Sequence, residues 1–225
     1  RISRLDGDAE TVSVVQIDSR RVGPGDLFVA IGGGGAHLAA ARARGAAAPL
    51  VPDDAFSAMA AIGRAARSGI AARVVAITGS VGKTSTKDIL TALLRHQQAN
   101  VVSAEDGYNN EIGLPLTLCR AGADTEVVVT EMGMRGHGQI RALAEIARPH
   151  VGVITAIAPV HLELLGSIEN VARAKAELLD FVEIAVLPER APELEPFVPA
   201  GLDVRRFGEP RLEMREDAEE SSAAV

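Results

Sequence analysis

The chain has 225 residues, 47% of them hydrophobic, which is enough for one large or two modest domains with a real core. Its net charge of −7 argues against a nucleic-acid-binding surface, although a local basic pocket is compatible with that balance. Cys119 is the single cysteine, so an intramolecular disulfide or a cysteine-based metal cage is excluded, as expected for a protein of the reducing cytoplasm. No apolar run is long enough to span a bilayer and no signal-peptide pattern is present, so no membrane insertion is expected.

The first part of the chain predicts a small α/β domain. Its elements are strands at 12–17 and 27–31, a flexible glycine turn at 32–35, a helix at 37–45, a short strand near 50–51, and a helix capped by Asp53 or Asp54 and ended by Ser68 and Gly69. We place a domain boundary after that helix, which makes residues 1–70 the first domain.

Strand and helix patterns alternate over residues 71–208, which favours a parallel sheet with helices on both faces. The expected strands are 74–77, 101–102, 127–129, 151–155, 184–187 and 204–207; the expected helices are 87–95, one that begins near Pro115, 138–147, and one capped by Ser167 that runs to about Asp180. Residues 209–225 are acidic and then small and polar, so disorder is expected there.

The stretch from Val74 to Asp88 organises this second part. Its apolar run suits a strand buried on both faces, and it breaks at Gly79 and Gly82 before a helical pattern begins. Glycines there let successive backbone N–H groups turn inward around a phosphate, at the positive end of the following helix. In such a loop Lys83 reaches the β- and γ-phosphates and Thr84 offers its hydroxyl to Mg²⁺. The stretch predicts a P-loop-type, ATP-binding α/β domain.

One detail departs from the general phosphate-loop pattern. Ile77 stands where that pattern has its first glycine, and Gly79 lies only three residues before Gly82. The alternative is an ordinary glycine-rich turn with a solvated lysine. We favour nucleotide binding because the strand, the glycines, the Lys-Thr pair and the helix occur together in the required order.

Glu131 and His161 follow the predicted strands 127–129 and 151–155. Parallel strands present ligand-binding groups at their carboxyl ends, so we expect both residues on the same edge as the loop. There we favour a magnesium-binding role for Glu131 over a cap or ion-pair role. For His161, and for Lys175 on a largely apolar helix stripe, a functional role and a structural or solvated one stay open on the residues alone.

The roles of two further pairs of polar residues also stay open on the residues alone. Asn109 and Asn110 either form a turn and helix start or orient phosphate or carboxylate oxygens. Ser19 and Arg20 either form a surface turn or bind an anionic ligand, with Arg20 able to contact a phosphate through two hydrogen bonds.

Taken together, these motifs resemble the Mur ligase family of peptidoglycan synthesis. The matching motifs are Thr78-Gly79-Ser80-Val81-Gly82-Lys83-Thr84-Ser85, Tyr108-Asn109-Asn110-Glu111-Ile112-Gly113-Leu114-Pro115, Glu131-Met132-Gly133, His161-Leu162-Glu163, and Ala174-Lys175-Ala176-Glu177. The short glycine spacing is the spacing of this family. The resemblance covers about residues 12–208 and is greatest for the branch that joins D-Ala-D-Ala to UDP-MurNAc-tripeptide.

The resemblance implies ATP-driven amide formation. ATP phosphorylates the terminal carboxylate of UDP-MurNAc-tripeptide, and the amine of D-Ala-D-Ala then attacks the acyl phosphate. Residues 78–85 become the ATP-binding loop, in which Lys83 stabilises the transferring phosphoryl group. Thr84 and Glu131 hold one Mg²⁺, and His161 helps to hold a second.

The remaining roles also come from the resemblance. Lys175 is carbamylated, which turns a cation into an oxygen ligand of the metal. Asn109 and Asn110 lie between ATP and the substrate carboxylate. Ser19 and Arg20 lie near the uridine diphosphate, in a first domain that receives the UDP end of the substrate.

The chain departs from the family in three places. Gly107 and Ala156 stand where members usually carry asparagine, and the glycines at 32–35 replace a longer loop. Nothing after Phe207 resembles the third domain of full-length relatives, which binds the incoming amine. This chain alone is therefore expected to bind nucleotides without completing ligation.

Two alternatives to this function remain. One is a catalytically incomplete nucleotide-binding module. The other is a different ligase of the superfamily, acting at an earlier Mur step or on folate. A GTPase switch is disfavoured, because no Asp-x-x-Gly follows a strand at a suitable place.

Overall fold

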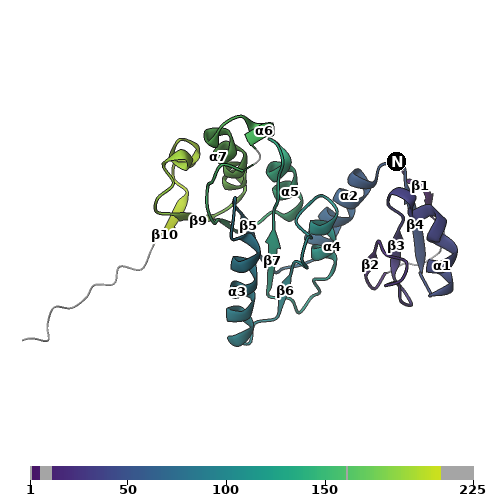
Figure 1. The fold of residues 1–225 in the computed structure, drawn as a ribbon. Coiled ribbons are helices and arrows are strands. Elements are labelled where there is room, and N and C mark those ends of the chain that lie inside the picture. The colour runs from purple at the N-terminus through teal and green to yellow at the C-terminus, as the bar shows by residue number, and fades with distance from the viewer. Residues whose placement is uncertain (1, 6–11, 161, 209–225) are drawn as a thin grey trace, which may run out of the picture.

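The computed structural model describes residues 2–5, 12–160 and 162–208, which form two sheets and the helices around them (Figure 1). The predicted α/β class is confirmed. The acidic tail expected at 209–225 lies outside the described residues. Among the helices that the structure does describe, none combines the length and the apolar character needed to cross a membrane.

The smaller sheet has four strands in the order β1-β4-β3-β2. Its three parallel strands are β2 (Val15–Gln16), β3 (Leu27–Val29) and β4 (Ala48–Pro52), and β1 (Ile2–Leu5), which the sequence did not predict, pairs antiparallel with β4. The flexible turn predicted at 32–35 is wrong: this segment is a 3₁₀ helix, η1 (Gly32–His37), in which the Gly34 N–H donates to the Ile31 carbonyl. Helix α1 (Leu38–Ala43) follows as predicted.

The larger sheet has six parallel strands in the order β10-β9-β8-β5-β7-β6. Their bounds are β5 (Arg73–Thr78), β6 (Val101–Ser103), β7 (Val127–Glu131), β8 (Val151–Ile154), β9 (Ile184–Pro188) and β10 (Asp203–Phe207). Strand β5 lies between β7 and β8, with Ile77 opposite Glu131 and Thr78 opposite Ile154. The chain segments that follow these three strands therefore leave the same edge of the sheet.

Helices cover both faces of the larger sheet, as predicted. They are α3 (Lys83–His96), α4 (Gly113–Cys119), α5 (Gln139–Ala147), α6 (Leu162–Leu165) and α7 (Ile168–Ala176), with 3₁₀ helices η2 (Glu177–Phe181) and η3 (Pro192–Phe197). Along β5 the side chains alternate: Ile77 packs beneath α3 with Leu90, whereas Val74 packs in a cluster with α4 and α5. The helix predicted from Ser167 to about Asp180 is divided, since α7 ends at Ala176 and η2 continues the chain.

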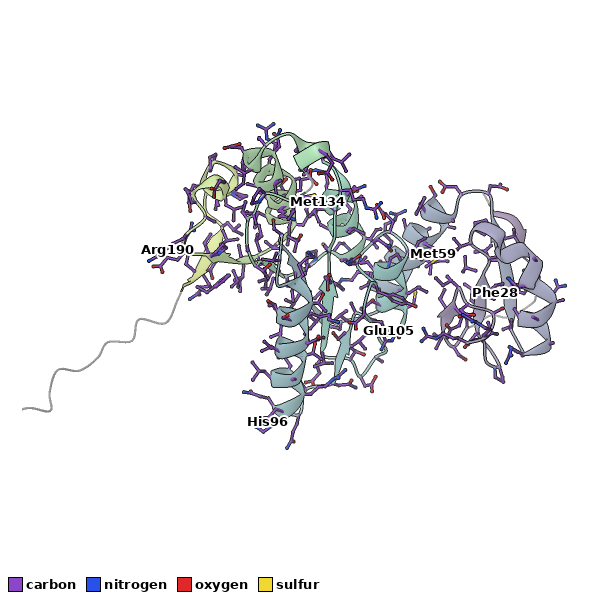
Figure 2. The ribbon with its side chains drawn as sticks, in the orientation of Figure 1. Phe28, Met59, His96, Glu105, Met134 and Arg190 are labelled. Carbon is purple, nitrogen blue, oxygen red and sulfur yellow. The ribbon has the colours of Figure 1, made fainter. Side chains whose placement is uncertain are left out.

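Helix α2 (Ala55–Ser68) connects the two sheets and packs against α4 and α5 (Figure 1). The Asp54 carboxylate accepts hydrogen bonds from the Phe56 and Ser57 N–H groups, which confirms the predicted cap. Met59, fully buried and labelled in Figure 2, packs in one cluster with Leu50 of the smaller sheet and Leu116 of α4. The predicted domain boundary at residue 70 therefore follows a helix that contacts both units, and the boundary stays a prediction.

Candidate nucleotide site

The loop between β5 and α3 is shaped by its two glycines and by the segment after β8. Gly79 has φ +147° and Gly82 has φ +82°, both in the region that favours glycine. A Cβ on Gly79 would lie 1.9 Å from the Thr155 hydroxyl oxygen, so a larger residue has no space there. The Thr155 hydroxyl also donates to the Val81 carbonyl at 2.6 Å. Thr155 thus fixes the loop, a role that sequence analysis missed because the contact joins distant segments.

Ser80 adds a second link to the segment after β8. Its N–H donates to the Ala156 carbonyl at 2.9 Å, and its hydroxyl donates to the Ala158 carbonyl at 3.1 Å. The bond from Ser80 to Ala156 uses only the main chain of Ala156. The alanine in place of the asparagine usual in the family therefore leaves this loop contact intact.

Lys83, Thr84 and Glu131 lie together at the carboxyl edge of the sheet. The Lys83 ammonium donates to the Gly79 carbonyl at 2.9 Å, and the Thr84 hydroxyl donates to Glu131 Oε2 at 2.9 Å. Glu131, only 5% exposed, ends β7 directly beside β5, and its Oε1 accepts a hydrogen bond from the Asn109 amide at 3.1 Å. A hydroxyl and a carboxylate held side by side present the hard oxygen donors that Mg²⁺ prefers.

Lys175 of α7 lines the same cavity as Lys83 and is 3% exposed. Within the described residues its ammonium has no hydrogen-bond or ion-pair partner. Burial, and then the nearby Lys83 charge, lower the pKa of Lys175 to about 8. His161, the other predicted ligand of a second metal, lies outside the described residues. In the part of the chain that the structure describes, no three His, Cys, Asp or Glu side chains cluster as a metal site.

A cavity of about 660 Å³ opens over the loop. Its lining residues come from the β5–α3 loop, the start of α3, the segments before α4, after β7 and after β8, and helices α2, α5 and α7. They are Phe56, Gly79, Ser80, Lys83, Asn109, Asn110, Glu111, Gly133, Met134, Arg135, Gln139, Val160 and Lys175. Lys83, Arg135 and Lys175 make the lining rich in cations, which suits a ligand with phosphates and carboxylates. Asn110 also accepts hydrogen bonds from the Ile112 and Gly113 N–H groups, so part of its role is to start α4.

Ser19 and Arg20 lie apart from this cavity, in an exposed turn of the smaller unit. The Arg20 side chain is 84% exposed and donates to the Asp18 carboxylate at 2.7 Å, and this contact lowers the pKa of Asp18 to about 2. The next residue, Arg21, reaches the larger unit, where its guanidinium donates to the Glu105 carboxylate at 3.2 Å. Figure 2 shows Glu105 on the part of the larger unit that faces the smaller sheet. Arg21 was not among the predicted site residues, because no local sequence pattern indicates contact with a residue 84 positions away.

A family model agrees with this geometry. The Mur ligase middle domain matches residues 77–210, from the end of β5 onward. The chain therefore belongs to the Mur ligase family, as its motifs indicated.

One curated relative and two solved structures carry the same name. The UDP-N-acetylmuramoyl-tripeptide--D-alanyl-D-alanine ligase, or MurF, of Synechocystis sp. is 38% identical over 181 residues, which covers 72% of this chain and 40% of that protein. MurF from Acinetobacter baumannii superposes with a TM-score of 0.77 at 27% identity, covering 90% of this chain and 49% of that one. MurF from Thermotoga maritima in complex with ADP superposes with a TM-score of 0.76 at 29% identity, covering 88% of this chain and 50% of that one. The chain spans about two fifths of its curated relative's length.

Proposed function

We propose that this chain is the nucleotide-binding part of an ATP-dependent ligase that joins D-Ala-D-Ala to UDP-MurNAc-tripeptide in the cytoplasm. The observation that carries the proposal is the contact between Thr84 and Glu131 at the mouth of the glycine loop. A hydroxyl and a buried carboxylate held 2.9 Å apart beside Lys83 provide both a phosphate site and a cation site. The names of the relatives supply the two substrates.

In this proposal the loop N–H groups and Lys83 bind the β- and γ-phosphates of ATP. Thr84 and Glu131 would hold Mg²⁺, which when bound neutralises negative charge on the phosphate oxygens. Lys83, held at the Gly79 carbonyl, would stabilise the charge that develops on the transferring phosphoryl group. The substrate carboxylate attacks the γ-phosphorus to give an acyl phosphate and ADP. The amine of D-Ala-D-Ala then attacks the acyl carbon and releases phosphate.

Other cavity residues take supporting roles. Asn109, bonded to Glu131, and Asn110 would lie between ATP and the substrate carboxylate. The Lys175 amine would add to CO₂ with loss of a proton, and the resulting carbamate would replace a buried positive charge next to Lys83 with a negative one. With His161, that carbamate would hold a second Mg²⁺. Ser19 and Arg20 would meet the uridine diphosphate from the smaller unit.

We also propose that the chain alone binds nucleotide without completing ligation, because it spans 40% of its Synechocystis relative. The test is calorimetric titration of the chain with Mg·ATP, followed by phosphate-release assays with tripeptide substrate and D-Ala-D-Ala. We expect binding without substrate-stimulated phosphate release. Robust turnover by the chain alone would contradict the proposed dependence on a further domain.

Glu131→Gln tests the cation site directly. It keeps the side-chain size but removes the negative charge, so we expect Mg·ATP binding about tenfold weaker or more and ATP binding in EDTA little changed. Glu126→Gln is the matched control, since Glu126 precedes the opposite end of β7 and accepts from the Asn100 N–H. Equal affinities for Glu131→Gln and the unsubstituted chain would remove the assignment.

A further inference from the structure

A second lysine of α3 lies one turn beyond Lys83 and does not line the cavity. Lys87 is 3% exposed, and its ammonium donates to the Ala104 carbonyl at 3.0 Å and to the Asp106 carboxylate at 3.1 Å. The Asp88 carboxylate also lies 3.1 Å away. Burying an ammonium is costly unless it is paired, and here two of its partners belong to the segment after β6 rather than to α3.

That segment leads directly to the candidate cation site. It begins at Ala104, whose N–H donates to the Val129 carbonyl of β7, and it reaches Asn109 five residues later. There the Asn109 carbonyl accepts from the Gly133 N–H at 2.8 Å, and the Asn109 amide donates to Glu131 Oε1 at 3.1 Å. The conformation of the segment therefore determines where the Asn109 amide meets the carboxylate.

Glu131 has two oxygens with different neighbours. Oε1 accepts from Asn109 and Oε2 accepts from Thr84. A carboxylate fixed at one oxygen keeps the other in a defined place, which a cation site requires. Lys87 thus stands at the start of a chain of contacts that runs through the segment and Asn109 to Glu131.

We propose that Lys87 is a positioning residue: it fixes the 104–109 segment so that Asn109 holds the Glu131 carboxylate in the orientation that binds Mg²⁺ with the nucleotide. This inference rests on the proposed function of the site. A purely structural lysine would contribute to the stability of the fold and leave the magnesium dependence of nucleotide binding unchanged.

The experiment compares ADP affinity by calorimetry in Mg²⁺ and in EDTA for the unsubstituted chain and for Lys87→Met. We expect Lys87→Met to lose about tenfold or more in affinity with Mg²⁺ and less than about twofold in EDTA, because the lysine acts through the carboxylate and not on the phosphates. Lys87→Arg, which keeps the charge and the donors, should recover part of the magnesium dependence.

Matched variants separate positioning from stability. Thr91→Val removes a hydroxyl one turn along α3 that donates to the Lys87 carbonyl and is hydrogen-bonded to the Ser103 hydroxyl. The substitution therefore disturbs the contact between α3 and β6 without touching the 104–109 segment. Thr91→Val should leave unchanged the ratio of the ADP affinity in Mg²⁺ to that in EDTA. Asp106→Asn should lower that ratio and Asp88→Asn should not, since Asp106 belongs to the segment and Asp88 to α3.

Two results would count against different claims. An unsubstituted chain that binds ADP equally with and without Mg²⁺ would remove the proposed function of the site. A magnesium-dependent chain whose ratio is the same in Lys87→Met would overturn the positioning role alone. If Lys87→Met fails to fold, the same measurement on Asp106→Asn tests the positioning role. An unchanged affinity ratio in that variant overturns the inference.

Discussion

The two regions for which the sequence predicted ligand contacts differ in how their side chains are held. At the carboxyl edge of the larger sheet, Glu131 is 5% exposed and each of its oxygens accepts a hydrogen bond from a different segment of the chain. In the turn of the smaller unit, the Arg20 side chain is 84% exposed and pairs with Asp18, two residues earlier. The first arrangement is preorganised by the fold, and the second is local and solvent-screened. Substitutions should therefore have much larger effects at the sheet edge than in the turn.

The largest effect is expected at Gly79. An alanine Cβ would overlap the Thr155 hydroxyl and lie 3.0 Å from the Thr155 nitrogen, at a φ that L residues rarely adopt. Gly79→Ala should therefore displace the loop and weaken Mg·ATP binding by about 100-fold or more, measured by calorimetry. Gly136→Ala is the control, because no atom lies within 4 Å of its added Cβ. Similar affinities for both variants would mean that the loop is not the phosphate site.

A pH-dependent effect is expected at Lys175. Its folded pKa is lowered from 10.5 to about 8, so between these values the unfolded chain binds the proton and the folded protein does not. Stability should rise with pH across this window, and below about pH 8 the folded protein carries a buried charge at a cost of about 3 kcal/mol.

Lys175→Met should consequently be more stable than the unsubstituted chain at pH 7, and this gain should shrink between pH 8 and pH 10.5. Urea unfolding in CO₂-depleted buffer measures it. Arg173→Met removes an exposed cation from the same helix and should give a difference that does not vary in this way. A constant gain for Lys175→Met would argue that its ammonium is well solvated.

An intermediate effect is expected at Lys83. Loss of one charge-assisted contact to phosphate should weaken Mg·ATP binding by about 10-fold to 100-fold. The control is Arg95→Ala, which removes a cation at the far end of α3, where it donates to the Val101 carbonyl. Equal affinities for Lys83→Ala and the unsubstituted chain, again by calorimetry, would contradict the phosphate-loop assignment.

The smallest effect is expected at Arg20. Arg20→Ala should weaken binding of the UDP-linked substrate by only about threefold to tenfold, because the side chain is exposed and screened by solvent. It should leave Mg·ATP binding unchanged. Arg205→Ala is a close control, since Arg205 forms the same kind of exposed pair with Asp203, two residues earlier. A loss as large as that at Lys83 would show that the turn is a preorganised site after all.

Local patterns in the sequence predicted the fold class, the strands of the larger sheet, a cap at Asp53 or Asp54 and one at Ser167, and a glycine-containing loop between β5 and α3. These predictions depend on residues that are close together in the sequence. For the loop, the strand, the glycines and the helix start all lie within one short segment, so neighbouring residues are enough to predict the conformation. The 3₁₀ conformation at Gly32–His37 and the division of the last long helix at Ala176 were not predicted. Glycine allows several conformations at similar cost, and packing against the rest of the fold selects among them.

By itself, then, the sequence predicted a phosphate-binding loop and the residues that form it. The tertiary structure decided which contacts hold that loop and its surroundings in place. They are Thr155 against Gly79, Asn109 against Glu131, Lys87 against the segment after β6, and Arg21 against Glu105. Each of these contacts joins segments that are distant along the chain. Strand order and register bring them together, and no local periodicity or spacing records which distant residues will meet.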